Sequence, residues 1–278
     1  PELLIFKVDM DFKFMGEERP DFIPSDANAA FYQLETVREL QTMVTDEVRD
    51  NPEWTNKPRL VMWVRKALGG AAFLPFVAQE IYFTSDGRHG GIGYLELTMS
   101  GRGDKVVQEK QYSLRIGRAE GLAIKGGHDP KIIKAMSRSD YVWSVTFVGG
   151  KPEFHEDASG DILLTDVASE GNRDTIQDVV RFRGIDVLML DAALAERLGV
   201  SNGTADTIED LLSKLGVDKG HTLIDGRSGQ IIEQWGRAVS EAHLEVRRLW
   251  REFGRVPQGG NNSDERTRTR GGQISLLN

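Results

Sequence analysis

The chain has 278 residues, with 35 Lys and Arg against 43 Asp and Glu and a formal net charge of −8. This length suits one large domain or two modest ones, and the negative balance excludes a general polyanion binder. Because the sequence contains no cysteine, it also excludes disulfides, cysteine-based zinc sites, iron–sulfur clusters and thiol nucleophiles.

Glycine content and apolar runs bound the class of protein further. The 30 glycines exceed the usual ~7% of residues and indicate many turns and hairpins. Apolar runs stay far below the ~18 residues of a membrane span, and no charged-then-apolar signal segment opens the sequence. We therefore expect a soluble protein without a membrane partner, either intracellular or assembled within a host cell, as a virion protein would be.

The front of the sequence predicts a strand followed by helices. Residues 4–14 alternate apolar and polar side chains, as in a strand with one wet face. A helix that Ser25 or Asp26 caps is expected to end at Asn51-Pro52. A second, short helix is expected over 59–68, where a glycine pair stops it.

Between residues 80 and 167 the pattern is typical of strands joined by glycine-rich turns. A hairpin is expected over 141–155, around Gly149-Gly150. The other strand-like segments are 80–84, 93–99, 106–116 and 161–167.

After about residue 172 the pattern becomes helical, with helices expected over 174–182, 191–198, 206–215 and 230–253. In the last helix, apolar residues recur at spacings of three and four, and such a stripe packs against a core or a neighbouring helix. We predict a subunit contact through Ile232, Trp235, Val239, Val246, Leu249 and Phe253.

Together these elements predict an α+β fold. It has a β-rich N-terminal half with long hairpins, a helical C-terminal half and an extended C-terminal tail. The expected domains are a β-rich lobe with an early helix over 1–155, a helical lobe over 156–256 and the tail over 257–278.

The tail combines a linker-like composition with basic charge and an apolar end. From Arg247 onward there are seven Arg against three Asp and Glu, a net +4 that leaves −12 in the remainder. Such a segment becomes ordered only against a surface. The acidic body of an identical neighbour is the expected surface, and nucleic-acid phosphates are the alternative. The residues in question are Arg88, Arg247, Arg248, Arg251, Arg266, Arg268 and Arg270, with Ile274, Leu276 and Leu277 as further subunit contacts.

Two sets of side chains are candidates for a divalent metal. Asp9 and Asp11 share one strand face, where two carboxylates can hold a cation, although the flanking lysines fit an ordinary solvated face. His155 and Asp157 lie among other acidic residues and have suitable ligand types, but their spacing favours an acidic hairpin loop. We therefore predict no resident metal and no cofactor.

Two further motifs have a functional and a structural interpretation. Residues 87–93 have the glycine content of an anion-binding loop, with Arg88 and His89 as contacts, but strand-like flanks favour a flexible hairpin tip. Residues 194–208 have the rhythm of a helix-turn-helix in which Ser201 could cap the second helix. The acidic residues on that second helix would repel phosphates, so a pair of helices used for packing is favoured.

These observations favour a non-enzymatic structural or assembly subunit of a homo-oligomeric, phage virion-type particle. Copies of the chain are the expected partners, because the tail ends in an apolar patch and catalytic motifs are absent from the sequence. A nucleic-acid-binding subunit that uses the Arg-rich last helix and tail is one alternative. A divalent-metal-dependent enzyme is the other.

Overall fold

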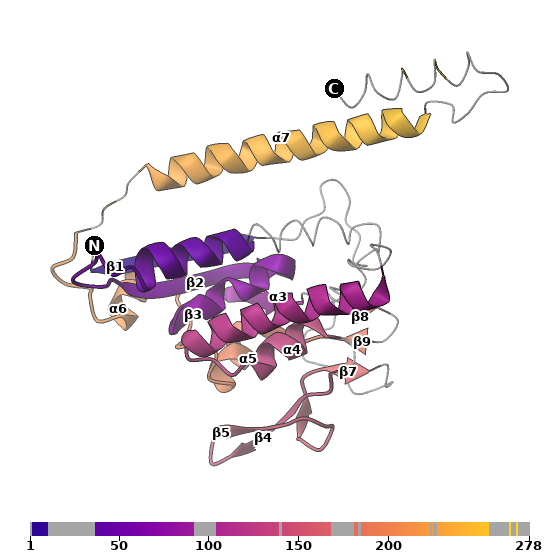
Figure 1. The fold of residues 1–278 in the computed structure, drawn as a ribbon. Coiled ribbons are helices and arrows are strands. Elements are labelled where there is room, and N and C mark those ends of the chain that lie inside the picture. Colours follow the sequence, from indigo (N-terminus) through magenta and orange to yellow (C-terminus); the bar gives the residue numbers. More distant parts are fainter. Residues whose placement is uncertain are drawn as a thin grey trace. The chain divides into compact units, whose positions relative to one another are not determined.

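The structure is a computed structural model that describes residues 2–10, 37–91, 104–138, 141–167, 181–182, 185–222, 224, 227–255, 267 and 271 (Figure 1). The chain divides into two compact units, Pro1–Asp218 and Lys219–Asn278. The first unit combines sheets with helices, and this confirms the α+β class.

The main sheet of the first unit has four strands in the order β1-β2-β3-β10. Their bounds are β1 Leu3–Met10, β2 Arg59–Leu68, β3 Glu80–Gly90 and β10 Met189–Asp191. Strands β1, β2 and β3 are mutually parallel, and β10 runs antiparallel to β3. Parallel neighbours need a crossover, and between β2 and β3 it consists of two buried 3₁₀ turns, η3 (Gly69–Phe73) and η4 (Pro75–Val77). The sheet is therefore built from crossovers, where hairpins were expected.

Strand β2 is covered on both faces. Met62 and Val64 belong to the larger core cluster, which also contains residues of the helices α3 (Lys105–Lys125) and α4 (Lys131–Ser137). Val61 and Trp63 point the other way, into a smaller cluster with residues of α6 (Ile208–Lys214). A strand that is buried on both faces has a continuous apolar run without alternation.

This double burial explains why the predicted helix over 59–68 is wrong. Residues 60–64 are all apolar, and a short apolar run does not distinguish a buried strand from a buried helix by periodicity. The β-branched and aromatic residues in the run favour the strand. The glycine pair that follows begins the η3 turn of the crossover.

The predicted strand over 106–116 is also wrong, because these residues form the first half of α3. Asp104 caps this helix, and its side chain accepts a hydrogen bond from the Val106 N–H. The core-facing residues of α3 are Ile116, Ala119 and Ala123. Within the predicted strand only the partly buried Tyr112 and the buried Ile116 pack against the core, so the helical spacing is clear mainly in the later turns.

Two small antiparallel sheets complete the strands. One has the order β5-β4-β6 and the other β7-β9-β8. Their bounds are β4 Ser144–Val148, β5 Lys151–His155, β6 Ile162–Leu163, β7 Asp166–Val167, β8 Arg181–Phe182 and β9 Ile185–Asp186. The predicted hairpin is confirmed as β4–β5, and Gly149 and Gly150 in its turn have φ of 60° and 82°, the positive values that favour glycine. The strand expected over 161–167 is split between the two sheets.

The helix predicted over 174–182 is wrong at its described end, because Arg181–Phe182 form β8. The other predicted helices that remain agree with the structure where it describes them. Residues 37–42 are α-helical and continue into the π-helical segment η2 (Met43–Arg49). Helices α5 (Ala192–Arg197) and α6 confirm two predicted helices, although Thr207 caps α6 through the Asp210 N–H. Helix α7 (Ser228–Arg255) in the second unit confirms the last one. Predictions that fall on residues 11–36, 92–103, 168–180 and 256–266 lie outside the described residues.

Gly126, which ends α3, tests the packing of this helix against the crossover. A Cβ at Gly126 would lie 2.0 Å from the Phe76 carbonyl oxygen, whereas a Cβ at Gly121 of the same helix meets nothing within 4 Å. We expect Gly126→Ala to lower the free energy of unfolding by about 2 kcal/mol or more. The control, Gly121→Ala, should raise it by up to about 1 kcal/mol. Urea denaturation measures both, and equal stability of the two variants would contradict the packing described.

Candidate functional site

The register of the main sheet breaks at the carboxyl ends of its parallel strands. On both edges of β2, pairing stops at Val64 and resumes at Lys66, so Arg65 is an extra residue. On β3, residues 84–87 form a longer excursion from the ladder. Bulges redirect side chains and are frequent beside active sites, and ligands of open α/β sheets bind beyond the carboxyl ends of strands. This edge is therefore the candidate functional site.

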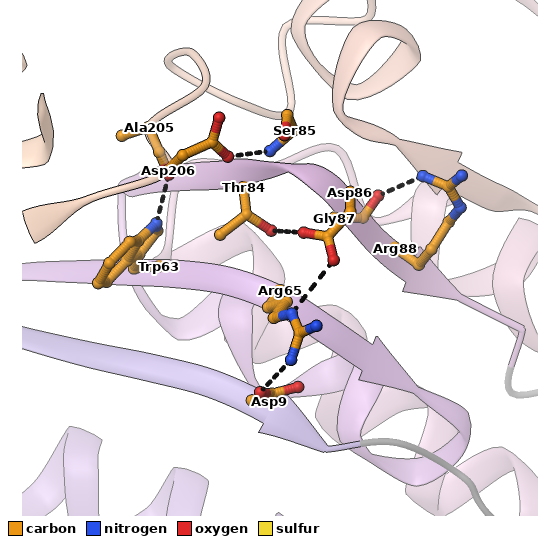
Figure 2. Close-up of polar contacts among 10 residues, drawn as sticks. All are labelled: Asp9, Trp63, Arg65, Thr84, Ser85, Asp86, Gly87, Arg88, Ala205 and Asp206. Atoms are coloured by element: carbon orange, nitrogen blue, oxygen red, sulfur yellow. Dashed lines mark hydrogen bonds and ion pairs between the residues drawn. The ribbon is translucent and has the colours of Figure 1, made fainter.

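Arg65 joins three strands at this edge (Figure 2). Its Nη1 donates to Asp9 Oδ2 of β1 at 3.1 Å, and its Nε donates to Asp86 Oδ2 of β3 at 3.2 Å. The Thr84 hydroxyl donates to Asp86 Oδ1 at 2.7 Å. Hydrogen bonds from Thr84 and then Arg65 hold the pKa of the Asp86 carboxyl below its usual value. Both carboxylates raise the pKa of Arg65, so Arg65 and Asp86 are both charged at neutral pH.

The excursion on β3 is also held from its other side. The Ser85 N–H donates to Asp206 Oδ1 at 2.6 Å, and the Trp63 indole N–H donates to the Ala205 carbonyl at 2.8 Å (Figure 2). The segment 202–206 thus lies along β3 where β10 does not reach. These contacts hold the β3 excursion against the segment 202–206, which is more than 100 residues further along the chain.

The geometry indicates what this site can do chemically. The Thr84 residue is only 6% exposed and its hydroxyl donates to Asp86, so it is not placed as a nucleophile. The Arg65 guanidinium is engaged by two carboxylates, and this disfavours its use as an anion receptor. The site is a rigid charged rim that holds the strand ends and presents carboxylate oxygens to solvent.

His89, in contrast, lies in the core and not at a flexible tip. It belongs to β3 and is fully buried, with Nε2 2.7 Å from the Ala72 carbonyl oxygen and its ring 4.8 Å from that of Phe76. Burial lowers the pKa of His89 to about 4, so the ring is neutral at pH 7. Its Nε2–H donates a hydrogen bond to the Ala72 carbonyl oxygen. Its Nδ1 has no hydrogen-bond partner among the described residues. The burial of His89 excludes it as an anion contact, and the hairpin tip expected here is wrong because residues 87–90 belong to β3. Arg88 donates to the neighbouring Gly87 carbonyl, and its contact with a partner stays a prediction.

Of the candidate metal ligands that the structure describes, Asp9 and Asp157 are engaged by other groups. Asp9 is engaged by Arg65, and Asp11 lies outside the described residues. His155 is on β5, and Asp157 lies in the following turn. Hydrogen bonds from the Ser159 side chain and then from the Ser159 N–H lower the pKa of the Asp157 carboxyl. Within the part of the chain that the structure describes, no group of three or more His, Asp and Glu side chains is arranged to hold a metal ion.

Helices α5 and α6 do not form the predicted packed pair. Residues of α5 belong to the larger core cluster, and residues of α6 belong to the smaller one on the opposite face of the sheet. Ser201 does not cap α6, because its hydroxyl donates to the backbone carbonyls of Ile81 and Gly203. The segment between the helices therefore follows the sheet edge.

The predicted contact residues of the last helix and the tail are described only in part. Trp235 is exposed, and Leu249 and Phe253 are partly exposed. Arg248 pairs with Glu245 and Glu252 of its own helix, and the subunit contact stays a prediction. The side chains that lie outside the description are those of Ile232, Val239, Val246, Arg247, Arg251, Arg266, Arg268, Arg270, Ile274, Leu276 and Leu277.

Comparison with known proteins finds a membrane protein. The chain is 25% identical over 199 residues to membrane protein NfeD1b of Bacillus subtilis (strain 168), a match that covers 72% of this chain and 35% of that protein. The chain thus spans about a third of the length of this curated relative. No protein-family model matches the chain. No solved structure matches it either.

This similarity corrects the functional predictions. The assignments to a phage virion-type structural subunit and to a nucleic-acid-binding subunit are wrong, because the protein that matches most of the chain is a membrane protein. The same similarity contradicts three further predictions. These are the partners expected for those roles, the absence of a membrane partner and the soluble intracellular location. Every helix within the described ranges is too short or too polar to cross a bilayer. The exclusion of a membrane partner was based on the short apolar runs of the sequence. Short runs exclude a membrane-spanning segment, but they do not exclude contact with a lipid surface.

The network at Arg65 predicts an energetic coupling between strands β2 and β3. We expect Arg65→Gln and Asp86→Asn to destabilise less together than the sum of their separate effects, as for partners in one ion pair. Because both side chains are solvent-exposed, this coupling should shrink as salt is raised. The pKa of Asp86 in the folded state is below its ordinary value of 3.8. The coupling is therefore fully present above pH 3.8 and is lost as the pH falls through the lowered pKa of the folded state. A double-mutant cycle in urea at several salt concentrations measures it, and additive effects would contradict the network.

Burial of His89 predicts a loss of stability in mild acid. The unfolded chain binds a proton near pH 6.5 and the folded chain only near pH 4. The free energy of unfolding is therefore highest above pH 6.5 and falls by roughly 3 kcal/mol as pH drops toward 4. We expect His89→Gln to remove most of this slope, with His128, whose pKa burial also lowers, contributing the rest. Titration of the His89 ring by NMR provides a second measurement, and a midpoint near 6.5 would contradict the burial.

Proposed function

We propose that this protein functions at a membrane, with the first unit as a folded α+β domain of a membrane-associated protein. The observation that supports this proposal is the similarity to membrane protein NfeD1b, which extends over 72% of the chain. Because the match includes only 35% of that protein, the proposal concerns location at a membrane and transfers no further property of the relative.

The architecture of the first unit is compatible with this role. Its main sheet is buried on both faces, and its strand ends are tied by the network around Arg65. Such a sheet needs no lipid cover, because helices and loops of the same unit already cover the apolar residues on both of its faces. Attachment to a membrane then depends on other surfaces of the protein.

Fractionation of cells that produce the full chain tests the proposal. We expect the chain to sediment with membranes and to rise with them in a density gradient, whereas a soluble marker protein stays in the supernatant. Washing the membranes at high salt and at alkaline pH distinguishes electrostatic from apolar attachment. Recovery of the whole chain in the soluble fraction at every ionic strength would contradict a function at the membrane.

A further inference from the structure

Helix α7 separates its apolar and charged residues onto opposite faces. With 3.6 residues per turn, all its large apolar positions except 244 fall within about 100° of arc, from Ile231 on one side to position 250 on the other, whereas position 244 lies on the charged side. This arc includes Trp235 and Phe253. All five Arg and four Glu of α7 fall on the remaining arc. The two faces continue along all 28 residues of the helix.

The apolar face is open to solvent where the structure describes its first turns. Ile231 is 56% exposed and Trp235 is 59% exposed. Large apolar side chains that lie together in water mark an interaction surface. This surface therefore needs a cover that tolerates aromatic residues and the arginines beside them.

The width and composition of the face favour a lipid surface over a second helix. A coiled-coil seam uses two positions in seven, whereas here Ile231 and Trp250 widen the stripe beyond those positions. Tryptophan and phenylalanine on one face with arginine on the other are typical of helices that lie in the membrane interface. Helices that lie in the interface have a lower mean hydropathy than helices that span the bilayer. This agrees with α7, which is not apolar enough to cross a membrane.

The charge of α7 indicates the kind of lipid. From residue 247 to 255 the helix has four Arg against one Glu, although the body of the protein is acidic. Arg248 is held by Glu245 and Glu252, and the other three arginines of this end are at positions 247, 251 and 255. Anionic headgroups attract such a segment within a Debye length of the surface. We propose that α7 binds the surface of an anionic phospholipid bilayer, with its apolar face in the headgroup–acyl boundary and its arginines at the phosphates.

This inference rests on the proposed function and names the surface that would attach the protein. It is tested with the purified full chain and vesicles of phosphatidylcholine, with or without phosphatidylglycerol, by co-sedimentation and flotation. We expect about tenfold or more stronger partitioning onto the anionic vesicles, and a decrease at high salt. Equal partitioning onto neutral and anionic vesicles would overturn the role of charge.

Matched variants separate the α7 face from general apolar exposure. The test variant is Ile231→Ser with Trp235→Ser, and the control is Leu114→Ser with Ile124→Ser on α3, where Leu114 and Ile124 are 71% and 59% exposed. We expect about tenfold or greater loss of vesicle binding for the α7 variant and less than about twofold change for the control. Because all four side chains are exposed, circular dichroism should show folded protein in both cases. Equal behaviour of the two variants would overturn the proposal.

A charge variant and the mass of the chain complete the test. Arg247→Glu with Arg251→Glu should abolish the preference for anionic vesicles. If the α7 serine variant instead changes the mass in light scattering and leaves vesicle binding unaffected, a second helix covers the face and the proposal is wrong. A chain that fractionates with cell membranes but ignores vesicles refutes the role of α7 and leaves the proposed function standing. Vesicle binding by a chain that is absent from cell membranes refutes the proposed function.

Discussion

The position of β2 constrains most of the first unit. This strand has parallel neighbours on both edges and a core cluster on each face, so its residues from Leu60 to Val64 must all be apolar. A parallel connection to β3 requires a crossover, and the short path through η3 and η4 stays buried. Helix α3 then packs over this crossover so closely that the helix must end in glycine at Gly126. Burial on both faces thus determines the path of the chain around the sheet.

Elements with a local signal could be predicted from sequence, and elements defined by distant contacts could not. The alternation of β1, the glycine pair of the β4–β5 hairpin and the apolar spacing of α7 lie within one short window. The apolar run in β2 shows no alternation of apolar and polar residues, because residues from elsewhere in the chain cover both faces of the strand. The first turns of α3 are exposed, so their sequence does not reveal the face that its later turns bury.

The candidate site shows the same limit. Asp9 could be found from its place on a strand face, but its partner Arg65 is 56 residues further along the chain. The bulge that places Arg65 between Asp9 and Asp86 depends on the register of three strands. A local signal exists only in the interruption of the β2 apolar run by a charged residue. The sequence therefore identified an acidic residue of the site, as a weak candidate for a metal ligand or part of a solvated face, whereas the structure pairs it with a guanidinium.

Helix α7 shows how one pattern supports different conclusions about partners. Spacings of three and four predict a face that something covers, and they do not identify the cover. The identity depends on the width of the face, its aromatic residues and the charge beside it, which separate a helical seam from a lipid interface. A helix with charged residues along one face has no long apolar run and is not apolar enough to span a bilayer. A protein whose apolar runs are all short can therefore still contact a membrane. Short apolar runs do not by themselves exclude a membrane partner.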